Sequence, residues 1–67
     1  MKKVDKLIYD LIDAEDKPID IRILFDKASK ENFLVSTEFS YALSNLLANN
    51  IVSLDYDRKL SIKNHIK

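Results

Sequence analysis

Residues 36–62 constrain the fold more than any other part of the chain, because an amphipathic helical pattern runs directly into two short alternating segments. The helical pattern places apolar residues three and four positions apart, on one face. Ser36 is the expected N-cap, and Glu38 falls in the first turn, where negative charge suits the helix dipole. Asn49 and Asn50 stand where a glycine often closes a helix. The apolar face consists of Phe39, Ala42, Leu43, Leu46 and Leu47.

Residues 51–62 alternate between apolar and polar side chains, which predicts two strands joined by a turn. A two-residue turn at 57–58 sets Leu54 opposite Ser61. A three-residue turn at 57–59 sets Leu54 opposite Ile62 and, in the same register, Tyr56 opposite Leu60. We expect this second register, because it keeps the apolar residues on one face of the hairpin.

Two further helical patterns precede this region. The first, over residues 4–12, gives way to acidic residues and Pro18, which both disfavour a continuing helix. The second is expected to begin after Asp20, whose carboxylate can accept N–H groups of the first turn. It is expected to end near residues 30–32, because asparagine tolerates the left-handed conformation that closes many helices. Ile19 is a candidate third strand. The apolar stripes are Val4, Leu7, Ile8, Leu11 and Ile12, then Ile21, Leu24, Phe25 and Ala28.

Length and composition predict one folded domain over residues 1–67, since a chain this short has room for one small core. Hydrophobic residues make up 46% and charged residues 33%, as in globular rather than disordered proteins. Cysteine is absent, which excludes disulfides, thiolate nucleophiles and cysteine-based zinc sites. Since no window approaches the roughly 20 apolar residues of a membrane span, we expect a cytoplasmic protein without membrane contact.

The order of three helices and a hairpin resembles the winged helix-turn-helix superfamily. The resemblance covers about residues 4–63 and implies an α+β fold, a winged helix in which three helices are followed by a C-terminal β-hairpin wing. Most members bind duplex DNA, with the third helix in the major groove and the wing on the flanking backbone, whereas others bind proteins. The residues that resemble the superfamily pattern are Ile21, Leu24, Ala28, Phe39, Leu43, Leu46, Leu47 and residues 51–54.

The outward face of the third helix is the expected recognition surface. It presents hydroxyl groups and one amide, with no lysine or arginine. Hydroxyl groups can contact phosphates, and asparagine can pair with adenine through two hydrogen bonds. The alternative is an ordinary solvated helix face. The candidate groove-facing residues are Thr37, Tyr41, Ser44 and Asn45.

Charge opposes strong DNA binding, because eleven basic and eleven acidic residues leave the chain without net charge. DNA affinity depends on lysines and arginines that displace counterions from the phosphates. Residues 51–67 nevertheless hold four basic and two acidic side chains, a local excess of positive charge. Arg58, Lys59 and Lys63 are therefore the expected backbone contacts of the wing, with Lys67 in the tail. The alternative is that these are ordinary solubilising charges.

No catalytic, metal or cofactor site is expected. His65 is the only histidine and has no cysteine to help it hold zinc. The acidic residues of 13–16 lack the spacing and the glycine of a calcium-binding loop. Without any glycine the chain also lacks the usual phosphate-cradling loop. These absences predict a protein that is not an enzyme.

Apolar residues outside the three stripes either cover the edges of the core or form a dimer interface. A symmetric homodimer would double the weak basic patch. The leading hypothesis is a small winged-helix protein that binds double-stranded DNA as a homodimeric transcriptional regulator. The rival is a winged-helix module that binds a protein partner and no DNA. The residues outside the stripes are Tyr9, Ile23, Leu34 and Ile66.

Overall fold

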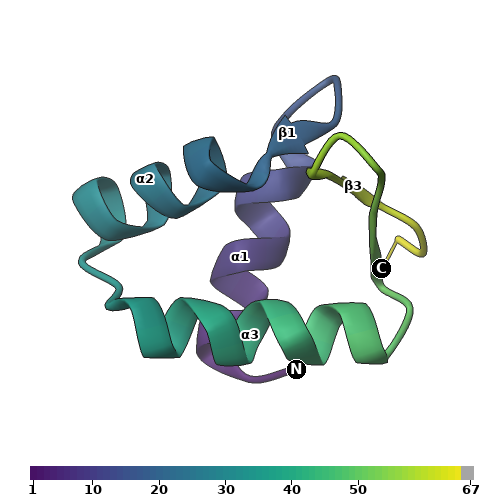
Figure 1. Cartoon of the computed structure of the whole chain (residues 1–67). Helices are drawn as coiled ribbons and strands as arrows, with labels where there is room; N and C mark the ends of the chain where they lie inside the picture. Colours follow the sequence, from purple (N-terminus) through teal and green to yellow (C-terminus); the bar gives the residue numbers. More distant parts are fainter. Residues whose placement is uncertain (66–67) are drawn as a thin grey trace.

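Three helices precede a small antiparallel sheet, an α+β arrangement with a winged-helix-like layout (Figure 1). The computed structural model describes residues 1–65, so Ile66 and Lys67 lie outside the described residues. In Figure 1, α1 stands upright between α2, at the upper left, and α3, which runs along the bottom. The sheet has the order β1-β3-β2. The elements are α1 (Lys3–Asp13), β1 (Ile19–Asp20), α2 (Ile21–Asn32), α3 (Ser36–Ala48), β2 (Val52–Leu54) and β3 (Lys59–Ile62).

The core draws one large, fully buried side chain from each helix and from the central strand. Phe25 and Phe39 join α2 to α3 through an edge-to-face ring contact, with ring centroids 5.1 Å apart. Within residues 1–65, every buried side-chain nitrogen and oxygen has a hydrogen-bond partner. No helix in this part of the chain is both long and apolar enough to cross a membrane. The four fully buried side chains are Ile8, Leu24, Leu46 and Leu60.

Helix α1 buries a face that is shifted from the predicted stripe. Ile8 and Ile12 are buried as expected, but Tyr9 and Asp5 are buried beside them. The rest of the stripe is only partly buried, and its members Val4 and Leu11 pack against the core. Tyr9 is therefore a core residue, and little of its surface is left for contact with another protein.

The start of α2 follows the sequence closely. The Asp20 carboxylate accepts the backbone N–H of Arg22 at 2.8 Å, which confirms Asp20 as the N-cap and lowers the pKa of that carboxyl. Ile19 pairs with Leu60 in β3, which confirms the third strand. Asp20, which caps α2, also belongs to β1, so the start of α2 is attached directly to the sheet.

The end of α2, at Asn32, lies within the range predicted from the sequence, but a different residue closes the helix. Phe33, rather than an asparagine, adopts the left-handed conformation, with φ of 60°, while Asn32 remains in the helix. The N–H of Leu34 returns to the carbonyl of Ala28 at 3.2 Å, and Leu34 packs against the core. Packing of Leu34 therefore fixes the end of the helix, even though this conformation is sterically unfavourable for a bulky residue.

The ends of α3 agree with the prediction at one terminus only. Ser36 is the first residue of the helix and Val35 is the N-cap, so the expected Ser36 cap is wrong by one position. The Glu38 carboxylate accepts the N–H of Val35 at 3.3 Å, which holds Val35 at the boundary. At the other end Asn50 adopts φ of 59°, as expected for a residue replacing glycine. The buried face is confirmed by Phe39, Ala42, Leu43 and Leu46, with Leu47 partly buried.

The hairpin register predicted from the sequence is wrong by two residues. Leu54 pairs with Leu60 and Val52 with Ile62, whereas the prediction paired Leu54 with Ile62. Strand pairing therefore ends at Leu54 and does not extend to Tyr56. The Asp55 carboxylate accepts the backbone N–H groups of residues 57 and 59 at 2.9 and 3.0 Å, which stabilises a turn at this point. Arg58 then takes the left-handed position, with φ of 61°, that usually favours glycine. A slip of two residues preserves the pairing of apolar side chains on one face, which is why the pattern could not exclude it.

Candidate nucleic-acid interface

The outward face of α3 is exposed and uncharged. Tyr41 is 76% exposed, and Thr37 and Ser44 lie on the same side of the helix. Together with Ser36 and Ser40 they line one shallow hollow. The hydroxyl groups can each donate and accept a hydrogen bond, whereas the Thr37 methyl and the Tyr41 ring offer apolar contact. We call Thr37, Ser40, Tyr41, Ser44 and Ala48 the α3 outer face.

Asn45 lies on the flank of α3 that turns toward α1. Its amide Nδ2 donates to the Asp5 carboxylate at 3.4 Å, and Asp5 is 9% exposed. Three of the four predicted groove-facing residues therefore share the α3 outer face, while the amide of Asn45 is engaged within the protein. The sequence pattern did not indicate Asp5, because it lies 40 positions from its partner.

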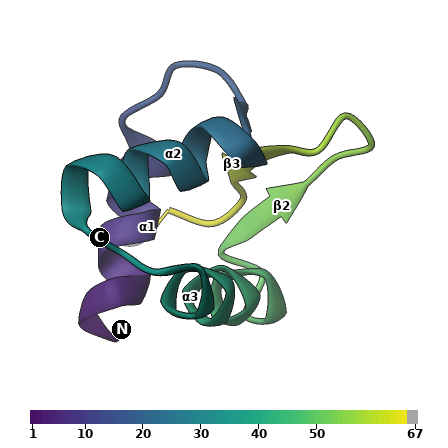
Figure 2. The ribbon, with the colours of Figure 1, turned by 60° about the vertical axis from the view of Figure 1, so that its left-hand side comes forward.

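The wing, residues 52–62, holds two predicted backbone contacts, and Lys63 follows it directly. Its turn projects away from the helices (Figure 2). The carbonyl of Arg58 accepts the N–H of Ile21 at 3.0 Å, which ties the turn to the start of α2. The N–H of Lys63 donates to the carbonyl of Ile51 at 2.8 Å. The backbone is thus fixed while the side chains of Arg58, Lys59 and Lys63 are exposed.

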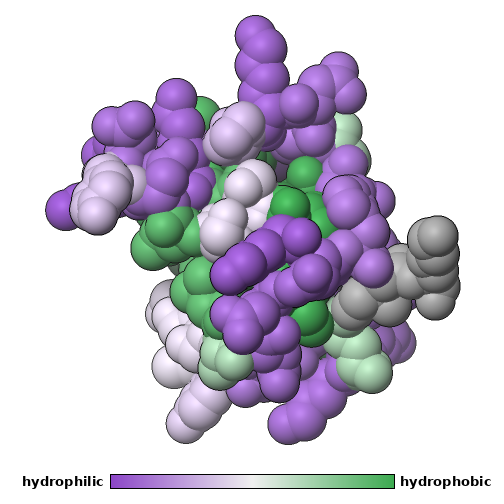
Figure 3. All heavy atoms as spheres, turned by 90° about the vertical axis from the view of Figure 1, so that its right-hand side faces the viewer, coloured by the Kyte–Doolittle hydropathy of each residue, from purple (hydrophilic) through white to green (hydrophobic). Residues whose placement is uncertain are grey.

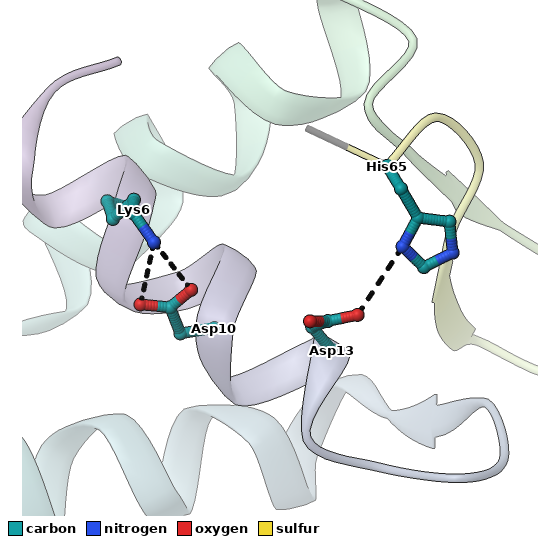
Figure 4. Close-up of polar contacts among 4 residues, drawn as sticks. All are labelled: Lys6, Asp10, Asp13 and His65. Carbon is teal, nitrogen blue, oxygen red and sulfur yellow. Dashed lines mark hydrogen bonds and ion pairs between the residues drawn. The ribbon is translucent and has the colours of Figure 1, made fainter. Parts of the chain in front are cut away.

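Lys6 of α1 and the three basic residues of α2 differ from the basic residues of the wing in having carboxylate partners. Lys6 lies 2.9 Å from Asp10, as Figure 4 shows, and Lys27 lies 2.7 Å from Glu15. Hydrogen bonds to these carboxylates raise the pKa of both lysines. Arg22 and Lys30 also form ion pairs. The basic residues without an ion pair to a carboxylate of residues 1–65 are Lys2, Lys3, Lys17, Arg58, Lys59 and Lys63.

Asp55, an acidic residue of the wing, is engaged by the backbone of the turn. It uses its carboxylate to accept the two turn N–H groups, and it forms no ion pair with a cation of residues 1–65. The side of the molecule that carries the hairpin is mostly hydrophilic, with hydrophobic residues showing in smaller areas between (Figure 3). Asp57, the other acidic residue of the wing, is exposed and likewise forms no ion pair with a cation of residues 1–65, so the basic side chains of the wing can contact an external anion.

His65 is exposed, and its Nδ1 lies 3.5 Å from a carboxylate oxygen of Asp13 at the end of α1 (Figure 4). This contact brings the C-terminal segment against α1. Across residues 1–65, histidine, aspartate and glutamate side chains do not gather in groups of three that could hold a metal ion. The contact of His65 with Asp13 is thus a contact between two side chains and does not belong to a larger cluster of metal-binding side chains within residues 1–65.

The apolar residues that fall outside the predicted stripes have different surroundings. Tyr9 is buried, and Leu34 is partly buried against the core. Ile23 is 54% exposed on α2, and Ile66 lies outside the described residues. Phe33, in the turn between α2 and α3, is 86% exposed. Of these residues and Phe33, only Ile23 and Phe33 expose enough apolar surface within residues 1–65 to contribute to a contact with another protein.

We expect Asn45→Ala to lower the free energy of unfolding by roughly 1 kcal/mol, because the buried Asp5 carboxylate loses a donor. Ser44→Ala is the matched control, since Ser44 is exposed and alanine favours a helix at both positions. Urea denaturation of both variants measures the difference. Equal stabilities would contradict a supporting role for Asn45.

Comparison with protein-family models, with curated proteins and with solved structures found no match for this chain. The functional proposal therefore rests on the surface chemistry of the chain itself.

Proposed function

We propose that this protein is a small winged-helix DNA-binding protein that acts as a transcriptional regulator. Arg58, Lys59 and Lys63 contact the phosphates, and the α3 outer face lies in the major groove. The observation that supports this most directly is that the basic side chains of the wing have no carboxylate partner within residues 1–65. Cations of α2 are neutralised by carboxylates, whereas those of the wing have none within residues 1–65. Lysine and arginine without an internal partner can displace counterions from DNA without first breaking an ion pair.

The absence of net charge affects how such binding would behave. A neutral protein has no long-range attraction for a polyanion, so its encounter with DNA is slow and its affinity depends on local contacts. Three phosphate contacts from the wing would give a salt dependence with a slope of roughly −3 in log affinity against log salt. We therefore expect weak binding that salt weakens further.

A fluorescence polarisation titration with random duplex DNA at low and moderate salt tests the proposal. We expect saturable binding at low salt, tighter than the roughly 10⁻⁴ M limit of ordinary non-specific affinity. Moderate salt should weaken it. If the full chain shows no binding at low salt, the protein does not bind DNA as proposed.

A second candidate, self-association or binding of another protein, is favoured by the apolar side chains that α2 and the following turn expose. Ile23 and Phe33 are both more than half exposed. A contiguous apolar patch, rather than a single exposed apolar residue, marks a protein contact surface, so this candidate requires apolar side chains of α2 and the turn to act together. We propose a second copy of the chain as the partner, because a symmetric dimer would also present two wings to one duplex.

Ile23→Glu is expected to abolish this self-association while leaving the helix content unchanged, because it places a charge in the interface but not in the core. Tyr56→Glu is the matched control, since it adds the same charge at the exposed turn of the wing. Sedimentation equilibrium and circular dichroism measure the two properties. A wild-type protein that is strictly monomeric at high concentration would exclude the homodimer.

A further inference from the structure

The α3 outer face contains apolar groups between its hydroxyls and has no charge. Thr37 contributes a methyl group, Tyr41 an exposed ring and Ala48 a second methyl group. The major groove offers one apolar feature, the C5-methyl group of thymine, which alanine, the threonine methyl and aromatic rings can contact. The chemistry of the face is thus complementary to thymine.

The side chains that read the other bases are missing or engaged. Guanine is usually recognised by arginine or lysine through two hydrogen bonds, and the α3 outer face has neither. Adenine is recognised in the same way by asparagine, but the Asn45 amide donates to Asp5. Cytosine can donate to a carboxylate, but the Glu38 carboxylate accepts the N–H of Val35. Hydroxyl groups bond to either kind of base and do not discriminate strongly.

We propose that the α3 outer face reads thymine methyl groups, so that the protein prefers A·T-rich duplex DNA. This inference rests on the proposed DNA-binding function. Thr37 and Tyr41 are four residues apart on the helix, about 6 Å along its axis. Successive bases of one strand are about 3.4 Å apart, so the two side chains match methyl groups roughly two steps apart. Ser40 and Ser44 lie on the same face, and their hydroxyl groups supply hydrogen bonds that do not discriminate between bases.

Replacing thymine by uracil tests the proposal, because it removes the methyl group and leaves the base pairing unchanged. Polarisation titrations compare one A·T-rich duplex with the same duplex containing deoxyuridine. We expect the uracil duplex to bind roughly 4-fold more weakly for each thymine methyl group that the protein contacts, the size expected for one buried carbon. A G·C-rich duplex should bind weakly, and 5-methylcytosine should restore part of the affinity because its methyl group occupies the same place in the groove.

Two variants of Thr37 separate its methyl group from its hydroxyl group. Thr37→Ser keeps the hydroxyl and loses the methyl, so the thymine duplex should bind more weakly and the penalty for uracil should shrink. Thr37→Val keeps a methyl and loses the hydroxyl, so the penalty for uracil should persist. Thr37 is exposed, and thermal melts check that both variants fold.

The outcomes distinguish this inference from the function on which it rests. DNA binding with equal affinity for thymine and uracil duplexes, or with a preference for G·C-rich DNA, would overturn thymine recognition and leave DNA binding intact. An unchanged uracil penalty in Thr37→Ser would overturn the role of Thr37. Absence of binding to any duplex at low salt would overturn the DNA-binding function itself.

Discussion

Leu46→Ala is expected to lower the free energy of unfolding by about 2 to 5 kcal/mol. Leu46 is 1% exposed and belongs to the buried face of α3, where loss of three carbons leaves a cavity. A domain of this size has roughly 3 to 10 kcal/mol of stability, so this single change removes a large part of it. Chemical denaturation at 25 °C measures the loss.

Leu54→Ala is the matched control, because it makes the same chemical change at a residue that is 45% exposed in the wing. Its effect should be well below that of Leu46→Ala, since less apolar surface returns to water. If both variants lost the same stability, or if Leu46→Ala lost less than about 1 kcal/mol, Leu46 would not be part of a packed core.

The helices of this fold could be predicted because their patterns are local. The buried face of α3 repeats every three to four residues, and burying Phe39 and Leu46 together requires a helix. The Asp20 cap is also local, since its carboxylate and the N–H of Arg22 are two residues apart. Contacts between distant segments were not predictable in this way. Asp5 and Tyr9 are buried by packing of α1 against elements that follow it in the chain, and Asp5 accepts the amide of Asn45 in α3.

The hairpin shows where a pattern of alternation stops being informative. Alternation fixes which residues share a face, and registers that differ by two residues satisfy it equally well. The choice between them depends on turn chemistry, in which Asp55 accepts two N–H groups and Arg58 adopts a positive φ. The chain has no glycine to mark that position, so the sequence held no strong signal for the turn.

The outward-facing part of the candidate interface could be predicted, because it also follows from a local helical pattern. Thr37, Tyr41 and Ser44 face outward because they lie opposite the buried stripe of α3. The engagement of Asn45 with Asp5 joins two helices, and no spacing in the sequence indicates it. Ion pairs within a helix, such as the one between Lys6 and Asp10, follow from a spacing of four residues.

Removing the positive charges of the wing turn is expected to weaken DNA binding on every sequence alike. Combining Arg58→Asn with Lys59→Ala should lower the steepness of the salt dependence by about two, because each of the two side chains neutralises one phosphate. Asparagine is chosen at position 58 because it tolerates the left-handed backbone found there. Polarisation titrations on random and A·T-rich duplexes, each at several salt concentrations, measure both quantities.

Lys6→Ala with Lys30→Ala is the matched control, since it removes the same two charges from α1 and α2. Both lysines are exposed and form ion pairs with a carboxylate four residues away. Net charge falls equally in the two double variants, so a general electrostatic effect would lower their affinities equally. Only direct phosphate contact makes the wing variant lose more of the salt dependence. If the control lost as much, the loss would be a general effect of net charge, and Arg58 and Lys59 would not be phosphate contacts.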